Sequence, residues 1–482
     1  MQAVCPAASA PFSSLSSLSL CHTSNGARFA LLRQVSLFPH PIHFRRSPMP
    51  PTPRALFSGL KNAVSGALNQ STAGGTTATP PPMVEHNLPP WEDLAAALPK
   101  ELESLKDRVP WAKERRFGLA GGKEPRVVFY RDNSSWCPYC ERVWLQLEEK
   151  QVPYKVEKIN MRCYGPKPEW YTRMVPSGLL PAVKIDGELI TESMDIMLRL
   201  EQEFPERSLL PPPGSQESKA LQGLLRLERQ LFGSWLRFIT SGWGDAGNGQ
   251  RFEETMADVD GALRRFGGPY FLGKEFSMID AVYAPFLERI AASVPYYKGL
   301  TVRNNKWSAV NGWYDAMDSR PAYHAMKSDD FTHVHDLPPQ IGECYHNDAS
   351  KDYWALVDGK AGSWDLPLKP ETTGWGFDEG TAGKGEAAYS LVTNHAAVVR
   401  FALRPLRNDA EAYAEAVDVV FRYVAKALLE GTEKAGELPA GLPKQVKKAV
   451  EHLRDNVGVP RDMSYPAARQ LRAHLNWALR QL

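Results

Sequence analysis

The chain has few cysteines: its 482 residues contain six. So sparse a set excludes the disulfide framework of a small secreted protein and favours a reducing compartment. No uninterrupted apolar run reaches about 18 residues, so we expect no membrane-spanning helix. The formal net charge is only +2, which gives no electrostatic footprint for nucleic acid.

Acidic residues are absent before Glu85. The preceding stretch carries six arginines and lysines and is rich in serine, alanine and proline, which is typical of an organelle transit peptide. Its serine-rich start favours a plastid. We therefore predict a transit peptide and disordered linker over 1–84. The predicted location is the chloroplast stroma, with mitochondrion and cytosol as alternatives.

Residues 125–205 alternate strand and helix signals, as expected for an α/β domain of the thioredoxin-like type. Asp186-Gly187 is a strong hairpin-turn dipeptide. The expected elements are strands at 127–130 and 154–159, a helix at 140–150, a hairpin of 182–185 and 188–190, and a closing helix at 194–203.

The remainder of the chain is predicted to be mostly helical. Leucines at 221, 224, 225, 227 and 231 form one apolar stripe, and Ile279, Val282, Phe286 and Ile290 form another. The predicted domains are an α/β thioredoxin-like domain at 120–208, an all-helical domain at 214–335, a loop-rich connector at 336–383, and a helical extension of unknown role at 384–482.

The most informative motif is Cys137-Pro138-Tyr139-Cys140, which follows an expected strand and opens an expected helix. Free amide groups and the dipole at a helix N-terminus stabilise a thiolate and lower a cysteine pKa. Cys137 is therefore the predicted nucleophile. Cys140, one turn later, is placed to resolve a mixed disulfide formed by the first cysteine.

A zinc site is the main structural alternative for this Cys-x-x-Cys pair. Tetrahedral zinc normally needs a second pair of ligands. The other cysteines are widely separated and form no second pair: they are Cys5, Cys21, Cys163 and Cys344. We therefore predict no metal.

Two further segments have the chemistry of a binding site. Pro181 stands just before an expected strand, where a proline is often cis, although a trans loop proline is the simpler alternative. In thioredoxin-like folds a cis-proline faces the helix that carries the thiol, and the residue before it, here Leu180, offers backbone groups to a peptide-like thiol. Ser193 begins an expected helix beside Glu192. Hydroxyl and helix N–H groups bind a carboxylate, and a glutamate binds an ammonium, although a plain helix cap is the simpler interpretation of this serine.

Ser277 and Asp280 have the spacing of a capping box at the start of an apolar helix. We interpret this pair as structural. Loss of Asp280 is expected to cost about 0.5–2 kcal/mol, as for an ordinary helix cap.

Together these motifs resemble the glutathione transferase superfamily. Trp-Cys-Pro-Tyr-Cys at 136–140 resembles the cysteine-type classes: omega, lambda and dehydroascorbate reductase. The chain looks like a plant or algal plastid member, and the resemblance covers about 120–330. The other matching segments are Lys-Pro-Glu-Trp at 167–170, Val-Pro-Ser-Gly-Leu-Leu-Pro at 175–181, Glu-Ser at 192–193 and Ser-Met-Ile-Asp at 277–280.

The resemblance implies an enzyme that uses glutathione as co-substrate. By that resemblance, the Cys137 thiolate forms a mixed disulfide with glutathione. Lys167 lies near the glycine carboxylate, Leu180 pairs through its backbone with the cysteinyl unit beside Pro181, and Glu192 and Ser193 hold the γ-glutamyl end.

One departure leaves the thiol mechanism open. Cysteine-type transferases usually keep another residue where Cys140 stands, and Cys-Pro-Tyr-Cys is instead the dithiol glutaredoxin pattern. Ser134 and Ser135 are close enough in sequence to offer the hydroxyl activation of other transferase classes. The choice between one and two working thiols is therefore undecided by the sequence.

The predicted function is glutathione-dependent thiol transfer or reduction. Its substrates would be glutathionylated thiols or small oxidants such as dehydroascorbate. One alternative is conjugation of electrophiles to glutathione. Another is a non-catalytic scaffold that docks a plastid partner, with the C-terminal helices mediating a homodimer or a protein contact.

The transit-peptide prediction has a direct test. Residues 1–84 should be cleaved, at least in part, after import into a plastid. Mass spectrometry of the native protein should find an N-terminus between about residues 30 and 85. An intact Met1 on the abundant cellular form would instead indicate a cytosolic protein.

Overall fold

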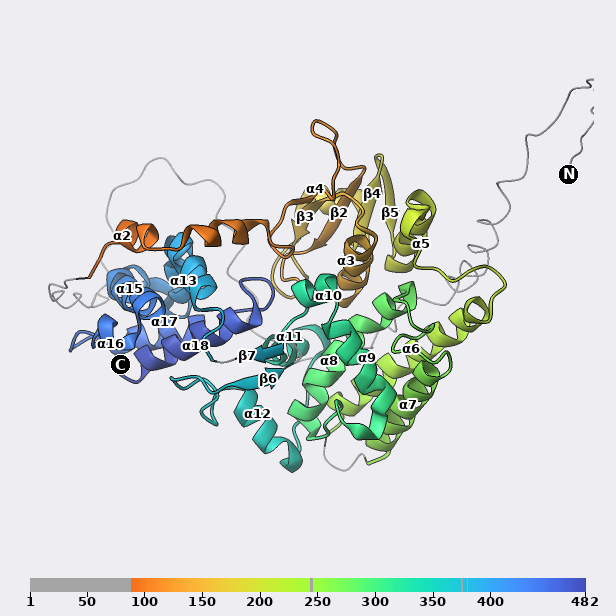
Figure 1. Ribbon diagram of the computed structural model, residues 1–482. Coiled ribbons are helices and arrows are strands. Elements are labelled where there is room, and N and C mark those ends of the chain that lie inside the picture. Colours follow the sequence, from red (N-terminus) through yellow and green to blue (C-terminus); the bar gives the residue numbers. More distant parts are fainter. Residues whose placement is uncertain (1–87, 243–245, 374–375, 379) are drawn as a thin grey trace, which may run out of the picture.

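The computed structural model describes residues 88–242, 246–373, 376–378 and 380–482 (Figure 1). The predicted transit peptide at 1–84 lies outside the described residues. Among those residues, no helix is long and apolar enough to cross a membrane.

A mixed sheet forms the α/β domain, with strand order β1-β3-β2-β4-β5. β2 and β3 are parallel, whereas β4 is antiparallel to both β2 and β5. The predicted hairpin turn is confirmed: Asp186 and Gly187 have φ of 50° and 88°, the left-handed region that this turn requires. The strands are β1 (Glu114–Arg115), β2 (Val127–Asp132), β3 (Tyr154–Ile159), β4 (Ala182–Ile185) and β5 (Glu188–Thr191).

Three helices belong to this domain: α3 (Pro138–Lys150), α4 (Glu169–Met174) and α5 (Ser193–Glu203). α3 begins two residues earlier than predicted, because proline at the first helical position needs no N–H partner. α3 contacts α5 and also α8 (Met278–Lys298) of the helical domain (Figure 1). The helix that follows Cys137 is therefore the central packing element of this half of the chain.

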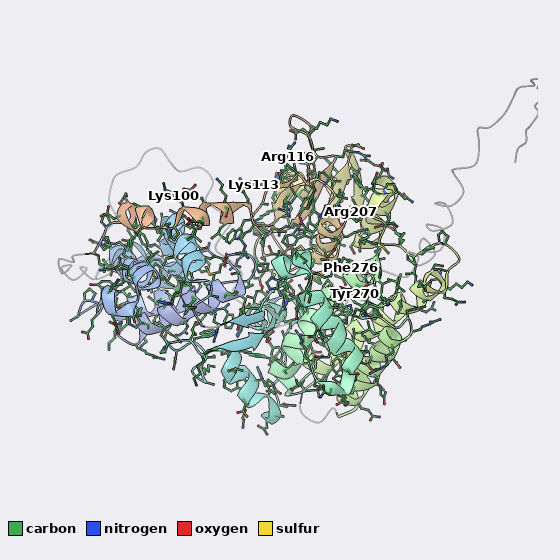
Figure 2. The ribbon with its side chains drawn as sticks, in the orientation of Figure 1. Lys100, Lys113, Arg116, Arg207, Tyr270 and Phe276 are labelled. Atoms are coloured by element: carbon green, nitrogen blue, oxygen red, sulfur yellow. The ribbon has the colours of Figure 1, made fainter. Side chains whose placement is uncertain are left out.

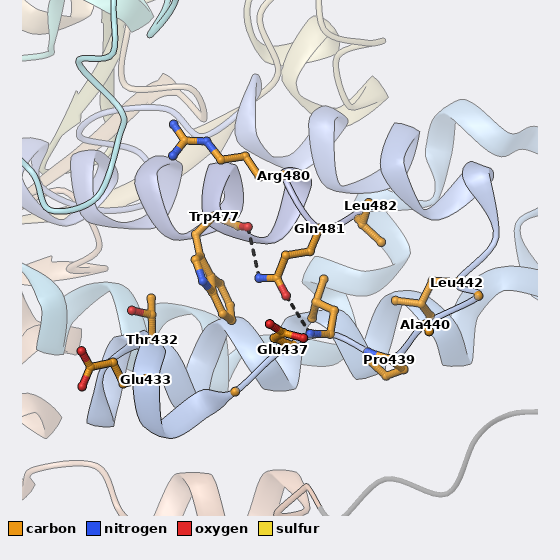
Figure 3. Close-up of a pocket in the computed structure, with 13 residues that line it drawn as sticks. Thr432, Glu433, Glu437, Pro439, Ala440, Leu442, Trp477, Arg480, Gln481 and Leu482 are labelled. Carbon is orange, nitrogen blue, oxygen red and sulfur yellow. Dashed lines mark hydrogen bonds between the residues drawn. The ribbon is translucent and has the colours of Figure 1, made fainter.

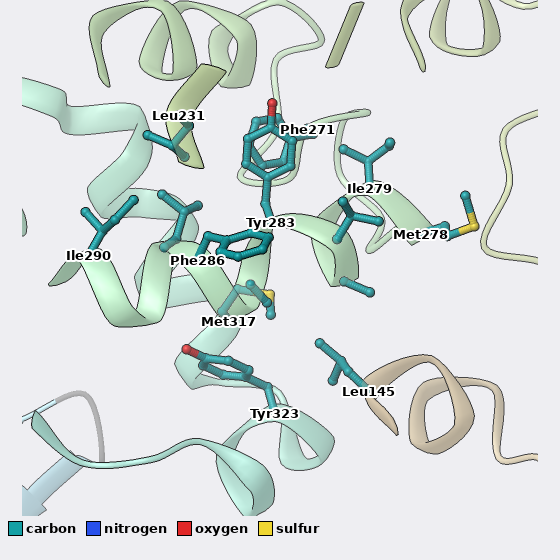
Figure 4. Close-up of a cluster of buried hydrophobic side chains, with 14 of the residues drawn as sticks. Leu145, Leu231, Phe271, Met278, Ile279, Tyr283, Phe286, Ile290, Met317 and Tyr323 are labelled. Carbon is teal, nitrogen blue, oxygen red and sulfur yellow. The ribbon is translucent and has the colours of Figure 1, made fainter. Parts of the chain in front are cut away.

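The helical domain packs a dense apolar core around α8. Both predicted stripes are confirmed as buried, apart from the half-buried Leu227, and Figure 4 shows Ile279, Phe286 and Ile290 converging in this core. The helices are α6 (Gln216–Thr240), α7 (Ala246–Arg264), α8 (Met278–Lys298), α9 (Ser308–Asp318), α10 (Pro321–Met326) and α11 (Asp330–Ile341).

Charged side chains tie this domain to α3. Arg320 donates to both Glu149 carboxylate oxygens, at 2.8 and 2.6 Å. Its guanidinium lies over the Phe276 ring, 4.4 Å from the centroid, and donates to the Tyr270 hydroxyl at 3.0 Å. Tyr270 and Phe276 lie together in Figure 2, with ring centroids 5.9 Å apart.

The predicted boundary at residue 335 falls inside α11, which continues to Ile341. The predicted connector also contains short regular elements: α12 (Lys351–Val357), β6 (Glu371–Thr373) and β7 (Gly376–Asp378). A chain cut near residue 336 would therefore divide a helix, and the domain division stays a prediction.

The C-terminal helices have a hydrophobic cluster of their own. Trp91 and Leu94, which precede the α/β domain in the sequence, also belong to this cluster. Trp91 Nε1 donates to Asp418 at 2.8 Å. The elements are α2 (Trp91–Ala96), a 3-10 helix (Lys100–Asp107), α13 (Lys384–Thr393), α14 (His395–Ala402), α15 (Ala414–Glu430), α16 (Thr432–Ala435), α17 (Lys444–Arg454) and α18 (Tyr465–Leu479).

Buried polar contacts join this extension to the start of α11. Arg472 donates to Asp329 at 2.6 Å, and both side chains are at most 2% exposed. The Val459 N–H donates to Thr332 at 3.0 Å, and the Ser328 hydroxyl donates to the Val459 carbonyl. The extension is therefore locked to the helical domain by directed bonds as well as by its own core.

The predicted capping box at Ser277 and Asp280 is confirmed. The sequence prediction underestimated the number of hydrogen bonds that Asp280 accepts. This fully buried carboxylate also accepts from the Phe271 N–H at 3.1 Å and from Trp313 Nε1 at 3.0 Å. One carboxylate thus caps α8 and also ties two other segments to it.

We accordingly raise the expected effect of Asp280→Ala. Two buried N–H donors would be left without a partner in addition to the lost cap, so unfolding should become easier by at least about 3 kcal/mol. Ser215→Ala is the matched control, because Ser215 caps α6 through a single bond from the Ser218 N–H at 3.1 Å. That variant should lose about 1 kcal/mol in the same urea titration. Equal losses would refute the larger role of Asp280.

Candidate active site

The ends of four strands meet at one edge of the sheet. Tyr130 of β2 pairs with Ala182 of β4, and Ala182 pairs with Thr191 of β5. Asp132, the last residue of β2, pairs with Ile159, the last residue of β3. The end of β2, the start of β4, the end of β5 and the end of β3 therefore lie side by side.

This edge collects the site residues that the sequence predicted. Cys137 follows β2, Pro181 immediately precedes β4, and Glu192 and Ser193 immediately follow β5. Lys167 lies in the segment after β3. Residues that are up to 56 positions apart in the chain are thus brought to one place by sheet pairing.

Cys137 is the N-cap residue of α3, with extended backbone angles, and is half-buried. The open amides of the first turn of α3 are therefore directed toward its side of the helix end. The positive end of the α3 dipole lies at this position. This is the placement that the sequence predicted for a nucleophilic thiol.

Cys140 has a different environment. It is 1% exposed and lies in the apolar core of the domain. Burial, together with a hydrogen bond to Cys137 and the charge of that thiol, raises the pKa of Cys140 well above its ordinary value. Cys140 is therefore a protonated thiol that can donate toward Cys137.

The loop before Cys137 is held by two neighbouring charged residues at the end of β2. Asp132 Oδ2 accepts from the Trp136 N–H at 2.7 Å. Arg131, fully buried, donates to the Ser135 hydroxyl at 2.9 Å and to the Pro110 carbonyl at 3.0 Å. Ser135 is thus occupied as a hydrogen-bond acceptor for Arg131.

Arg289 of α8 reaches the same loop from the helical domain. It donates to Glu141 Oε2 at 2.8 Å and to the Trp136 carbonyl. Burial raises the pKa of Glu141 to about 7, against the opposing attraction of Arg289. Beside them, His333 Nε2 lies 2.6 Å from Glu288, and burial lowers the pKa of His333 to about 3, so this ring is neutral.

The Leu180-Pro181 peptide bond is cis, as expected. Leu180 is half-buried and Pro181 is buried. The turn before them is fixed by the Tyr171 hydroxyl, which donates to the Leu179 carbonyl at 2.6 Å. The backbone of Leu180 is therefore held at the sheet edge, where an extended ligand backbone can pair with it.

Glu192 and Ser193 form the start of α5. Glu192 is exposed and has φ of 64°, whereas Ser193 is buried as the first helical residue. Within the part of the chain that the structure describes, neither side chain forms a hydrogen bond or ion pair. Ser193 is not acting as a side-chain cap, so both groups are available to a ligand.

Lys167 Nζ donates to the Asn160 carbonyl at 2.8 Å. Burial lowers the pKa of Lys167, while the thiols of Cys140 and Cys137 raise it. No carboxylate pairs with Lys167 among the described residues, so an external anion has access to this cation.

Sequence reasoning missed the groups that hold the loop: Arg131, Asp132 and Arg289. For Arg131 and Asp132, the sequence did offer a signal: they are adjacent charged residues at the end of an expected buried strand. No local signal identified Arg289, whose contact with Trp136 spans 153 positions. It also missed Arg229, which lies 3.5 Å from the Tyr139 hydroxyl beside the motif.

A separate hollow of about 840 Å³ lies in the extension, between α16, the 436–442 loop and the C-terminal end (Figure 3). Trp477, Arg480 and Glu433 are among its lining residues. Gln481 crosses it, accepting from the Leu438 N–H at 2.8 Å. The hollow contains none of the predicted site residues and no thiol.

Among the described residues, no group of three or more histidine, cysteine or acidic side chains is arranged to hold a metal ion. Cys163 and Cys344 are free thiols elsewhere in the fold. The chemistry that this edge offers is therefore that of a thiol at a helix N-terminus, together with one cation, one anion, a hydroxyl and a strand-like backbone.

Comparison with known proteins identifies similar chains. Residues 136–203 match the family described as "Glutathione S-transferase, N-terminal domain", and residues 245–316 match "Glutathione S-transferase, C-terminal domain". The chain is 29% identical over 192 residues to Glutathione S-transferase DHAR2 of Arabidopsis thaliana, across 40% of this chain and 84% of that protein.

Two other relatives have similar identity. Glutathione S-transferase DHAR3, chloroplastic, of Arabidopsis thaliana is 31% identical over 169 residues, which cover 34% of this chain and 59% of that protein. Pyrimidodiazepine synthase of Drosophila melanogaster is 30% identical over 198 residues, which cover 40% of this chain and 77% of that protein. Both family matches end before α10, so they do not include the extension.

Proposed function

The chain belongs to the glutathione S-transferase superfamily, a superfamily of enzymes, and from that membership we propose that it catalyses glutathione-dependent thiol transfer through Cys137. The substrates are mixed disulfides of glutathione or small oxidants of the dehydroascorbate type. Relatives named for the latter activity support this choice. The carrying observation is the half-buried Cys137 thiol at the start of α3, at the same edge of the sheet as cis-Pro181.

The reaction proceeds in two exchanges. The Cys137 thiolate attacks the glutathione sulfur of a mixed disulfide, the old S–S bond breaks, and the released thiolate takes a proton from water. A second glutathione, ionised by losing its proton, then attacks the glutathione sulfur on Cys137. This step forms glutathione disulfide and regenerates the Cys137 thiolate, so two electrons and the protons balance.

Each end of glutathione has a chemical counterpart at the sheet edge. Lys167 supplies a cation for the glycine carboxylate, and Leu180 supplies backbone groups for the cysteinyl unit. Glu192 offers an anion to the γ-glutamyl ammonium, and Ser193 with the α5 amides offers donors to its carboxylate. The unpaired state of Glu192 and Ser193 favours this assignment.

A one-thiol mechanism fits the two cysteines better than a two-thiol mechanism. Cys140 is buried and its pKa is raised, so its thiolate is scarce and the disulfide on Cys137 is resolved more readily by free glutathione. Cys140 serves instead as a hydrogen-bond donor that stabilises the Cys137 thiolate.

Two other functions remain as alternatives. Conjugation of glutathione to electrophiles would use the same glutathione site but not the Cys137 thiolate as nucleophile. A scaffold role would use the extension, where the hollow beside Trp477 offers a surface to a partner. Higher activity on chlorodinitrobenzene than on mixed disulfides would favour conjugation.

We also propose that the protein works in a plastid. The acid-free N-terminal segment favours this location, and one relative is named chloroplastic. The extension at 384–482 is proposed as a unit for homodimer or partner contact, with its own hydrophobic cluster as support.

The cysteine variants test the thiol mechanism. Cys137→Ser should abolish nearly all glutathione-disulfide exchange, because a serine hydroxyl does not ionise near neutral pH. Cys140→Ser should retain most of it, since free glutathione resolves the intermediate and the serine hydroxyl can still donate. Steady-state exchange on a glutathionylated peptide measures both. Equal loss in the two variants would contradict the one-thiol mechanism.

The γ-glutamyl pocket has an independent test. Ser193→Ala removes one hydrogen bond to a charged carboxylate, worth about 1.5–3 kcal/mol, and should weaken glutathione binding by about ten-fold or more. Calorimetric titration gives the affinity, with Cys137→Ser as the background to prevent turnover. Ser104→Ala is the control, because this exposed serine lies outside the sheet edge and its hydroxyl donates only to the Glu101 carbonyl at 2.8 Å. Unchanged affinity in Ser193→Ala would place the pocket elsewhere.

A further inference from the structure

Arg289 is buried immediately behind the nucleophile loop. Its side chain is 1% exposed, although it belongs to α8 of the helical domain. One terminal nitrogen donates to Glu141 Oε2 at 2.8 Å and to the Pro285 carbonyl at 2.6 Å, and the other donates to the Trp136 carbonyl. Removing a cation from water costs free energy, so a guanidinium buried this deeply is expected to have a structural or functional role.

The residues that Arg289 holds stand on either side of Cys137. Trp136 is directly before it, and Glu141 is in the first turn of α3, where its N–H donates to the Cys137 carbonyl at 3.0 Å. A single guanidinium therefore joins both ends of the 136–141 segment that contains the nucleophile.

Neighbouring residues hold the backbone N–H, the carbonyl and the ring of Trp136. Among the described residues, only its Nε1 has no hydrogen-bond partner. Its N–H donates to Asp132 at 2.7 Å, its carbonyl accepts from Arg289, and its ring lies 4.6 Å from the Arg289 guanidinium. The planar peptide bond transmits the orientation of the Trp136 carbonyl to the Cys137 amide. The Cys137 backbone is thus oriented from a different domain.

We propose that Arg289 is a positioning residue for Cys137: it bridges Trp136 and Glu141 and so sets the nucleophile at the end of α3. This role rests on the proposed function only in naming Cys137 as the nucleophile. Lysine cannot replace arginine here, because one ammonium does not reproduce the planar fork that reaches two acceptors at once.

Arg472 of the extension provides a closely matched control. It is also 1% exposed, donates to one carboxylate (Asp329, 2.6 Å) and one carbonyl (Val457, 2.8 Å), and lies over an aromatic ring (Phe331, 4.3 Å). Its contacts are with α11, the extension and Trp364, and include no residue of the Cys137 segment. The two arginines therefore have similar burial and similar types of contact, and they differ mainly in which segments of the chain they contact.

The experiment compares Arg289→Lys with Arg472→Lys in the full chain. Three quantities are measured at about pH 8.5, where Glu141 is ionised: the melting temperature, the rate at which iodoacetamide modifies Cys137, and kcat and KM for glutathione-disulfide exchange. Peptide mass spectrometry assigns the modified site, since Cys163 and Cys344 are also free. Both variants should melt earlier.

Only Arg289→Lys should slow Cys137 modification and lower kcat, by about ten-fold or more, because small displacements of a reacting group are costly. KM for glutathione should stay unchanged, since the Lys167 and Ser193 sites are not touched. Glu141→Gln, which keeps an acceptor for Arg289 but removes its charge, should give a smaller effect in the same direction.

Equal slowing in both lysine variants, or no slowing in either, would overturn the proposal. If Arg289→Lys does not fold, the same comparison is decided by Glu141→Gln against Arg472→Lys. The alkylation rate does not depend on the physiological substrate. A wild-type protein that is alkylated at Cys137 but exchanges no disulfide would therefore refute the proposed function without refuting the positioning role.

Discussion

The two halves of the transferase unit are held in register by three ion pairs along α3, of which two are buried and the Glu149–Arg320 pair is partly exposed. Glu141 pairs with Arg289, Arg142 pairs with Glu228 at 3.2 Å, and Glu149 pairs with Arg320. Apolar packing alone is non-directional and tolerates sliding between helices. A buried charge that loses its partner is strongly destabilising, so these pairs allow one relative placement of α3. The position of Cys137 depends on that placement.

Much of the local structure was predictable from sequence. The strand at 154–159, the hairpin around Asp186-Gly187 and the capping box at Ser277 each depend on residues within a short window. The predicted site residues also converged, because the strand order of this fold brings their segments to one edge. Local periodicity and turn chemistry are sufficient for such features.

The ion pairs along α3 were not predictable in this way. Arg142 and Glu228 are 86 positions apart, and Glu149 and Arg320 are 171 apart. Arginine and glutamate in a helix normally indicate a solvated face, and nothing in the local pattern distinguishes a buried pair from an exposed one. The same reason explains why the extent of Asp280 bonding was underestimated.

The extension shows a second limit of sequence reasoning. Its helices were predicted from their apolar stripes. The packing of Trp91 and Leu94 into its hydrophobic core was not predicted. These residues precede the α/β domain in the sequence. The hydrophobic core of the extension is therefore built from segments on both sides of the transferase unit.

This chain path has a mechanical consequence for the nucleophile loop. Arg131, near the end of β2, donates to the carbonyl of Pro110, which follows the 3-10 helix that contacts α13 of the extension. The neighbouring Trp111 Nε1 donates to the Arg461 carbonyl of the extension at 2.8 Å. On its other side, the loop is held by Arg289 from α8. The Cys137 segment is therefore supported by the helical domain and by a segment that is itself tied to the extension. In this chain the C-terminal helices belong to the structural support of the sheet edge where the thiol lies.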